Sequence, residues 1–430
     1  MAGRPYAMLC PRPISIPLAL AFLVAAPAPA QHLLVPMDER QNDHLKAYGL
    51  AYWCLQEPRV YRIEWLLNYA CGAFLLPAGD DVLARARQTG VTTEPVSGAQ
   101  LQQIRATIAD SNAESVVLEK APRVAVYIPP DKEPWDDAVT LALTYADIPY
   151  DKLWDAEILA GRLADYDWLH LHHEDFTGQH GKFWSAFRHE SWYRRTVQTA
   201  ESAAAQAGYR SVQAYKCAVA KAIREWVGNG GFLFAMCSAT DTLDIGLAAE
   251  GVDIVPPEID GTPIDPNAQA RLNYAKTLAF KDFLLIEDPA SNEFSDIDIS
   301  TPRDTMVSRG QTFRLFEFSA KQDPVLTMLT QDHTGVIHDF LGQTTAFRRS
   351  RLKDTVMVMG ESADGQVAKY IHGDYGKGTF TFYGGHDPED YAHIVGEAPT
   401  DLSFHKHSPG YRLILNNILF PAAKRQEKKT

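Results

Sequence analysis

The sequence is poor in cysteine and lacks the loops with which many enzymes bind nucleotides. Only 5 cysteines occur in 430 residues, which excludes a small scaffold built on disulfides. A Walker A loop, a Gly-x-Gly-x-x-Gly turn after a first strand and a Ser-Gly-Gly-x-Asp-Ser pyrophosphate loop are all missing from the sequence. We therefore expect no ATP, no dinucleotide and no other organic cofactor, and leave zinc as the one alternative.

Positive charge is also scarce, and long apolar runs are missing beyond the first thirty residues. The formal net charge is −13, and such an acidic surface repels nucleic acids and anionic membranes. After residue 30, no segment is apolar over the length that a membrane-spanning helix needs. We expect a small molecule, a peptide or a sugar as the partner, with no nucleic acid and no membrane insertion of the mature chain. The oligomeric state stays open.

The N-terminus has the pattern of a secretory signal peptide. Arg4 and Arg12 precede an apolar run over residues 14–26, and Ala-Pro-Ala at 28–30 is typical of a cleavage site. The apolar run is too short to span a membrane. We predict that residues 1–30 are removed and that the protein is exported to the periplasm or the extracellular space.

Four cysteines remain in the predicted mature chain, and export would place them in an oxidising compartment. Cys54 and Cys71 are the plausible local disulfide pair. Cys217 falls on a helical pattern and fits a buried core position. Cys237 has to stay unpaired if it is a catalytic nucleophile.

The order of apolar runs predicts two units, both of the α/β class. Residues 31–121 form a smaller N-terminal unit, and residues 122–425 form a larger one with an irregular insertion at about 256–350. In the larger unit, short apolar runs alternate with helical patterns, which favours a parallel sheet with helices on both faces. The expected strands of this sheet lie at 123–128, 150–154, 167–173, 232–236, 355–360, 367–372 and 378–383.

The segment around Cys237 has the features of a nucleophile elbow, the tight turn between a strand and a helix that carries a reactive side chain. A strand is predicted over 232–236 and a helix from Thr240 onward, with small residues at Ala235 and Ala239. A cysteine at a helix N-terminus is favoured as the thiolate. The alternative is a buried structural cysteine at the end of a strand.

A histidine follows the last predicted strand and can supply the base that thiol catalysis needs. His386 comes after two glycines at the end of 378–383, and Asp387 and Glu389 follow it. Open parallel sheets place their sites at this carboxyl edge, where His386 could reach Cys237 and a carboxylate could orient the imidazole. The alternative is a capped turn in which these side chains make only local hydrogen bonds.

A second group of polar residues ends the strand predicted over 167–173. His170 and His172 share one face of this strand, and together they could bind zinc with Glu174 or Asp175 as a third ligand. Equally, His172, His173 and Glu174 could border the cysteine site and bind substrate. We keep His170, His172 and Asp175 as weak metal candidates, because no known zinc signature surrounds them.

These residues together resemble the class I glutamine amidotransferase-like superfamily. Residues 235–239 match its elbow, and residues 377–389 are similar to its final strand with the His-Pro-Glu ending. The resemblance covers 123–422 apart from the insertion, and it implies a flavodoxin-like sheet. The spacing His-Asp-Pro-Glu is one residue longer than the superfamily pattern, so Asp387 can replace Glu389 as the orienting carboxylate.

The whole chain also resembles an exported bacterial family commonly called asparagine synthetase B. Residues 166–179 and 386–391 carry this second resemblance. The name implies ATP and glutaminase chemistry, but the sequence has neither the pyrophosphatase loop nor an N-terminal glutaminase cysteine. The activity that the name implies is therefore not expected of this sequence.

The leading hypothesis is an exported thiol-dependent hydrolase of an amide or peptide bond. Cys237 would attack, His386 would move the proton, and the Ser238 N–H would help to bind the oxyanion. One alternative is a non-catalytic sugar- or peptide-binding protein whose cleft is lined by His172, His173 and Trp168. Another is a zinc-dependent hydrolase that uses the histidine cluster.

Overall fold

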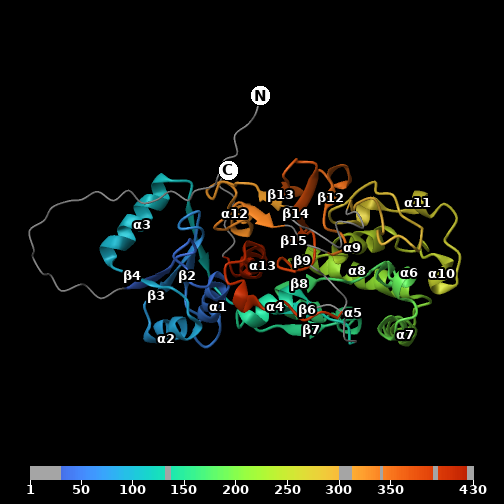
Figure 1. The fold of residues 1–430 in the computed structure, drawn as a ribbon, viewed down its shortest axis with the longest axis horizontal. Helices are drawn as coiled ribbons and strands as arrows, with labels where there is room; N and C mark the ends of the chain where they lie inside the picture. Colours follow the sequence, from blue (N-terminus) through green and yellow to red (C-terminus); the bar gives the residue numbers. More distant parts are fainter. Residues whose placement is uncertain (1–30, 131–136, 300–311, 339–341, 391–395, 424–430) are drawn as a thin grey trace, which may run out of the picture.

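The computed structural model describes residues 31–130, 137–299, 312–338, 342–390 and 396–423 (Figure 1). Strands and helices both contribute to it, which confirms the predicted α/β class. No helix of these residues is long and apolar enough to cross a membrane. The predicted signal peptide lies outside the described residues.

Within the described residues, the N-terminal part forms an antiparallel five-stranded sheet in the order β4-β1-β3-β2-β5. Its strands are β1 (His32–Val35), β2 (Ile63–Leu67), β3 (Ala73–Pro77), β4 (Glu94–Val96) and β5 (Glu114–Leu118). Its helices are α1 (His44–Leu55), α2 (Asp80–Thr89) and α3 (Gly98–Asp110). The sequence did not indicate β1 or β5, because four or five residues are too few for a clear period.

The second sheet has ten strands among the described residues, and half of it is parallel. The parallel strands are β6 (Val124–Tyr127), β7 (Asp151–Leu153), β8 (Trp168–Leu171), β9 (Phe232–Met236) and β15 (Gly378–Tyr383). Their order in space is β7-β6-β8-β9-β15. In chain order, this is 2-1-3-4-5.

The other half of this sheet is antiparallel, so the expectation of a parallel sheet holds only in part. Its strands are β10 (Thr312–Leu315), β11 (Val336–His338), β12 (Phe347–Arg348), β13 (Met357–Ser362) and β14 (Val367–Tyr375). A hairpin joins β14 directly to β15, and a short turn allows only antiparallel pairing. The insertion predicted at 256–350 thus contributes strands β10 and β11 to the edge of the sheet.

Helices cover both faces of the parallel strands, so successive side chains of a strand point alternately into two apolar cores. Phe232, Phe234 and Met236 of β9 belong to one apolar core, whereas Leu233 and Ala235 belong to the other. The first core includes α4 (Ala138–Tyr145) and α13 (Pro409–Leu419), and the second includes α8 (Val212–Gly228) and α9 (Ala239–Ala248). The remaining helices are α5 (Asp155–Leu159), α6 (Trp184–Phe187), α7 (Ser191–Gln206), α10 (Pro257–Asp260), α11 (Ala268–Arg271) and α12 (Pro324–Leu329).

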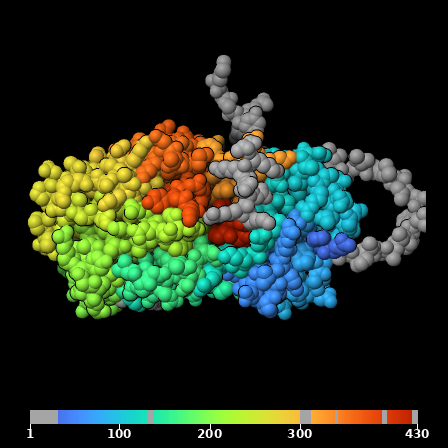
Figure 2. Space-filling view, turned by 180° about the vertical axis from the view of Figure 1, so that it is seen from behind, coloured from blue at the N-terminus to red at the C-terminus, as the bar shows by residue number. Residues whose placement is uncertain are grey.

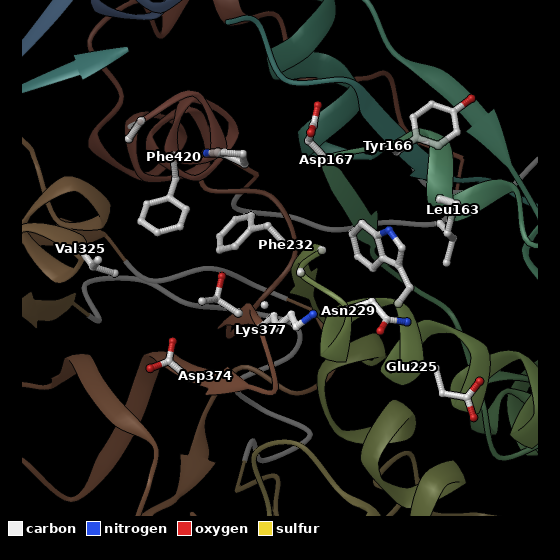
Figure 3. Close-up of a pocket in the computed structure, with 18 of the residues that line it drawn as sticks. Leu163, Tyr166, Asp167, Glu225, Asn229, Phe232, Val325, Asp374, Lys377 and Phe420 are labelled. Carbon is white, nitrogen blue, oxygen red and sulfur yellow. The ribbon is translucent and has the colours of Figure 1, made fainter. Parts of the chain in front are cut away.

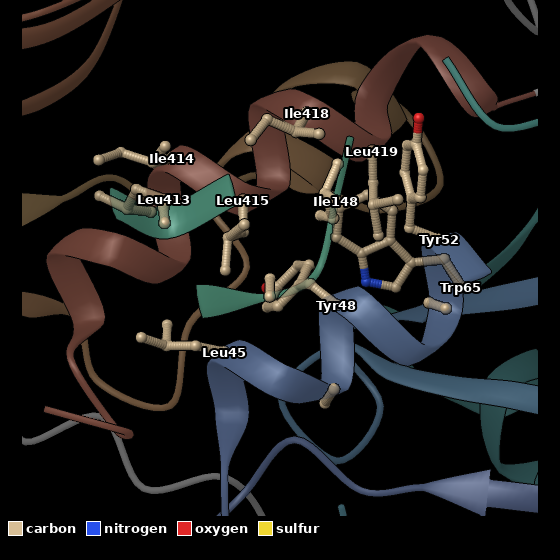
Figure 4. Packing of buried hydrophobic residues seen from close by; sticks show 14 of the residues in the cluster. Leu45, Tyr48, Tyr52, Trp65, Ile148, Leu413, Ile414, Leu415, Ile418 and Leu419 are labelled. Carbon is tan, nitrogen blue, oxygen red and sulfur yellow. The ribbon is translucent and has the colours of Figure 1, made fainter. Parts of the chain in front are cut away.

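Helices α1 and α13 join the two sheets into one apolar core (Figure 4). The Tyr48 hydroxyl of α1 donates a hydrogen bond of 2.5 Å to Asn416 of α13. Arg412 of α13 is fully buried and donates to the carbonyl oxygens of Met37 and Cys71, at 3.0 and 2.9 Å. Figure 2 shows the N-terminal part (blue) packed directly against the rest of the chain.

The predicted disulfide between Cys54 and Cys71 is wrong. Cys54 is a free thiol inside α1, and burial raises its pKa to about 12. Its side chain packs in the core that α1 shares with its neighbours, so the helix directs the sulfur inward. Cys217 is also free and buried, as its helical pattern indicated.

Candidate functional site

The polar residues singled out in the sequence follow the carboxyl ends of neighbouring parallel strands. His172 and His173 follow β8, Cys237 follows β9, and His386 comes three residues after β15. Backbone hydrogen bonds tie the three chain segments together, because Cys237 N–H donates to Gly385 O at 3.0 Å and Ala239 N–H donates to His172 O at 3.1 Å.

Cys237 occupies a strained turn between strand and helix. Its φ of 51° lies in the left-handed region, which is uncommon for residues with a Cβ and is typical of a nucleophile elbow. Strand β9 ends one residue before it and α9 begins two residues after it. The backbone therefore has the geometry that the small neighbours Ala235 and Ala239 indicated.

The chemical state of Cys237 differs from the sequence-based expectation. The residue is only 2% exposed, and its pKa is raised to about 12, first by burial and then by the carboxyl groups of Asp241 and Asp298. Hydrogen bonds from the backbone N–H groups of Ser238 and Gln343 oppose this shift only in part. Burial and the nearby acids thus oppose the thiolate form of Cys237 that its place at a helix N-terminus predicts.

Asp241 is a functional candidate that sequence reasoning missed. It lies in the first turn of α9, where its Oδ1 accepts a hydrogen bond of 3.1 Å from the Thr344 hydroxyl. Burial, and then the charge of Asp298, raise its pKa well above the usual value. Burial and Asp298 thus both favour the protonated form of Asp241. An acidic residue four positions after the elbow cysteine was the available signal.

Cys237 and His386 meet at Gly342. A Cβ placed on Gly342 would lie 2.8 Å from the His386 Cβ and 3.5 Å from the Cys237 Sγ. Gly342 also has a φ of 113°, which favours glycine. The structure thus brings together the two residues that the sequence pairs, around a position that tolerates no side chain.

Three imidazoles converge at this edge. The rings of His172 and His173 stack with centroids 4.1 Å apart, and that of His386 lies 4.4 and 4.5 Å from them. The Nε2 atoms of His173 and His386 are 3.1 Å apart. One nitrogen from each ring lies within 4.8 Å of the other two, an arrangement that could hold a metal ion. The sequence grouped His172 with His173 but did not add His386.

A second group lies directly behind this cluster and includes a residue that the sequence did not indicate. Asp137 Oδ2 lies 3.3 Å from His170 Nε2 and 3.2 Å from His172 Nδ1. Burial opposes the charge of Asp137, but the two imidazoles outweigh it and hold its pKa well below the usual value. Asp137 also caps α4 through Oδ1. An acidic helix cap after β6, at the same sheet edge, was the signal that could have located it.

Two residues predicted to take part in the site, one as a metal ligand and one as part of the cleft, lie away from the histidine cluster. Asp175 is in neither group, because its carboxylate accepts hydrogen bonds from Thr177 and Gly181 within its own loop. Trp168 was expected to line a cleft, but it is fully buried at the amino end of β8, where it stacks on His170. Strand direction explains this error, since only residues at the carboxyl end of β8 reach the site.

The remaining candidates surround the cluster. Asp387 Oδ1 accepts the Glu389 N–H at 2.9 Å, which is the local turn that the alternative interpretation described. The Glu389 carboxylate pairs with His405 at 3.2 Å. Glu174 accepts the His172 N–H at 2.6 Å, and Ser238 is fully buried beside Cys237.

Two cavities differ in size and position. A small pocket of about 100 Å³ is lined by His173 and Glu174. A larger cavity of about 990 Å³ lies at the amino ends of β9 and β15, lined by Phe232, Lys377 and Phe420 (Figure 3). We place the site at the smaller pocket, because the histidine cluster adjoins it and ligands of open parallel sheets bind at the carboxyl edge.

Comparisons with known proteins give no family and no function. No family model matches the chain, and no curated protein matches it. Two solved structures, cytoplasmic protein STM3548 from Salmonella typhimurium and cytoplasmic protein STM1381 from Salmonella typhimurium LT2, are 12% and 13% identical, and each match covers 70% of this chain and 100% of the other. Their TM-scores are 0.34 and 0.35. Gan42B, a GH42 beta-galactosidase, is 11% identical over 62% of this chain and 28% of its own, with a TM-score of 0.25.

Proposed function

We propose that this protein is an exported, metal-dependent hydrolase of an amide or peptide bond, with a divalent cation such as zinc held by His172, His173 and His386. The observation that carries the proposal is the convergence of three ring nitrogens within 4.8 Å at the carboxyl edge of the parallel strands. The strand order 2-1-3-4-5 supports a flavodoxin-like sheet, in which this edge is the usual site.

The spacing of one pair of nitrogens, those of His173 and His386, fits zinc. Two imidazole nitrogens on one tetrahedral zinc ion lie about 3.3 Å apart, given Zn–N bonds of about 2.0–2.1 Å. The 3.1 Å between the Nε2 atoms of His173 and His386 is close to that value. Three protein ligands leave a fourth position open, as in catalytic zinc sites. His173 also lines the small pocket, so the cluster borders a space that a substrate could enter.

The surrounding residues have separate tasks in this proposal. A bound zinc ion would polarise a carbonyl group and lower the pKa of a water molecule to about 7. Asp137 orients His172, because a proton on Nδ1 directed at the carboxylate leaves the lone pair of Nε2 for a ligand bond. His170 donates through Nδ1 to Phe234 O at 3.2 Å, which fixes its ring beside Asp137.

The test is metal content and hydrolysis in the full-length protein. Purified protein should hold about one zinc ion per chain by elemental analysis and should cleave members of a peptide library. His173→Ala and His386→Ala should lose the metal and the activity, whereas His189→Ala, at an exposed position, should keep both. A protein that cleaves its substrate at full rate with no metal bound would refute the proposal.

A thiol-dependent hydrolase remains the second candidate, because the elbow geometry of Cys237 favours it. The φ of 51° and the two N–H groups directed at the sulfur resemble a nucleophile with its oxyanion site. His386 would then be the base, with Asp387 or Glu389 to orient it. Cys237→Ser should abolish hydrolysis under this mechanism. It should leave zinc binding intact and most activity in place under the metal mechanism.

The relationship to class I amidotransferase-like proteins is likewise a proposal. The strand order and the elbow support it. The second family resemblance, to the exported proteins commonly called asparagine synthetase B, has only its sequence segments in support.

A further inference from the structure

The small pocket beside His173 has a buried ammonium group in its wall. The pocket is about 100 Å³ in volume, and several aromatic side chains line it. Its aromatic residues are Tyr127, Trp154, Phe183, Trp192 and Tyr193. Lys216 of α8 also lines it, although the residue is only 8% exposed. A buried lysine in an aromatic wall needs a hydrogen-bond partner for each N–H.

Lys216 has partners for two of its three donors. Its Nζ donates to the Tyr127 hydroxyl at 2.7 Å and to Asp155 Oδ2 at 2.8 Å. Within the described residues, the third N–H has no hydrogen-bond acceptor; the rings of Tyr127 and Trp154, with centroids 5.3 and 5.4 Å away, give only a weaker electrostatic contact. Lys216 lines the pocket, so a ligand oxygen in the pocket could accept this N–H.

The charges around the pocket select the type of oxygen. Asp155 already neutralises Lys216, and the carboxylates of Glu174 and Asp175 line the same pocket. A ligand carboxylate would therefore meet net negative charge, whereas a ligand ammonium has no acceptor for the remaining N–H of Lys216. A neutral carbonyl or hydroxyl oxygen avoids the repulsion and accepts this N–H.

The volume limits the size of the group. A cavity of about 150 Å³ holds a benzene molecule, so about 100 Å³ suits a branched aliphatic group more than an aromatic ring. We propose that this pocket is the substrate subsite for a compact, uncharged, mainly apolar group that ends in one carbonyl or hydroxyl oxygen, bound by Lys216. The assignment rests on the proposed function, because it takes the nearby histidine cluster as the reacting centre.

Three probes of equal shape test the charge argument on the full-length, zinc-free protein. Isobutyramide, isobutyrate and isobutylamine differ mainly in their polar end, and quenching of Trp154 and Trp192 fluorescence reports their binding. Isobutyramide should bind about tenfold more tightly than the other two, the usual worth of one hydrogen bond to a charged group. Lys216→Met should remove this preference. Lys221→Met, on the same helix at an exposed ion pair with Glu250, should retain it.

A second variant separates binding from folding, since Lys216→Met leaves Asp155 without its partner. Ala200→Leu on α7 fills the pocket without changing a charge, and Ala205→Leu on an exposed part of the same helix is its control. Ala200→Leu should abolish probe binding, and Ala205→Leu should not. The proposal of a subsite would be overturned if the three probes bound equally well, or if the Ala200→Leu variant bound them as tightly as the wild type does. Probe binding without any hydrolysis would instead contradict the proposed function and leave the subsite standing.

Discussion

At the scale of single residues, the site combines buried acidic side chains with a backbone that leaves little room for a side chain at Gly342. Asp241 and Asp244 lie three residues apart in α9, and both are fully buried. Burial raises the pKa of each, that of Asp244 to about 6 and that of Asp241 well above its usual value. Their hydrogen bonds differ, however, and this difference leads to opposite expectations for the same substitution.

Asp241→Asn should raise the thermal stability above pH 5, whereas Asp244→Asn should lower it. A raised carboxyl pKa means that the folded state binds the proton more tightly, so the wild-type chain loses stability as pH rises from about 4 to the folded pKa. An uncharged amide in place of the Asp241 carboxyl group removes that loss. Asp244 accepts hydrogen bonds from the N–H groups of Leu278, Ala279 and Phe280. An asparagine amide has only one acceptor oxygen, so at least one of these buried N–H groups would lose its partner, and the free energy of unfolding should fall by about 1–3 kcal/mol.

Melting temperatures of the wild type and both variants between pH 4 and pH 8 measure these effects. The curve of Asp241→Asn should be flatter than that of the wild type over this range. A curve parallel to the wild type would mean that Asp241 is ionised in the folded protein, against the shift that burial and Asp298 impose.

Gly342→Ala should displace His386 and release the metal. The new methyl group would lie 2.8 Å from the His386 Cβ, closer than side chains tolerate. Gly161→Ala is a matched control, because its φ of 79° carries similar backbone strain but no atom lies within 4 Å of the new Cβ. Zinc content should fall for Gly342→Ala and stay at the wild-type level for Gly161→Ala. Retained zinc in both variants would show that His386 is not a ligand.

At the scale of elements, α4 connects the helix cap to the histidine cluster through Asp137. Oδ1 caps the helix by accepting the Thr140 N–H at 2.8 Å, and Oδ2 faces His170 and His172. Helix formation and orientation of a ligand thus depend on the two oxygens of one side chain. No local sequence pattern connects this helix cap with the histidines.

Asp137→Asn and Asp137→Ala should separate these two roles. Asparagine can still cap the helix through its carbonyl oxygen but removes the charge, so we expect about 10–100-fold weaker zinc binding with little loss of stability. Alanine should show the same weakening and also lose about 1 kcal/mol from the missing cap. Zinc titration and chemical denaturation measure the two effects. Unchanged zinc affinity in both variants would remove Asp137 from the site.

Elements with a strong local pattern could be predicted, whereas those defined by long-range contacts could not. The apolar run at 232–236, the elbow residue Cys237 and the strand at 378–383 have clear signals in the sequence. Asp137 joins His172 only through the pairing of β6 with β8. The pKa of Cys237 is raised by burial and also by the charge of Asp298, which is distant in the sequence. Neither contact has a local signature.

At the scale of the whole molecule, the two sheets behave as one structural unit. Helix α1 belongs to the N-terminal part, yet its apolar side packs on α4 and α13. Gly49 of α1 comes so close to the residue after α4 that a Cβ would lie 1.9 Å from Ala146 O. Such contact differs from the mobile linker that often separates domains. The sequence placed a boundary near residue 121, but apolar patterning cannot show how closely two units pack.

This shared core predicts that the two parts unfold together. Arg412 is fully buried in α13 and donates to Met37 and Cys71 of the N-terminal part, while its own helix packs on the larger sheet. Arg412→Met removes both of these hydrogen bonds from the core, so calorimetry should show one transition at a lower temperature, with a loss of about 2–5 kcal/mol. Asn417→Leu, in the same helix, removes a hydrogen bond to the Tyr370 hydroxyl within the larger part and is the matched control. This variant should also unfold in a single transition at a lower temperature, because the core is continuous. Two separate transitions in either variant would mean that α1 and α13 only touch, and that the histidine site can fold without the N-terminal sheet.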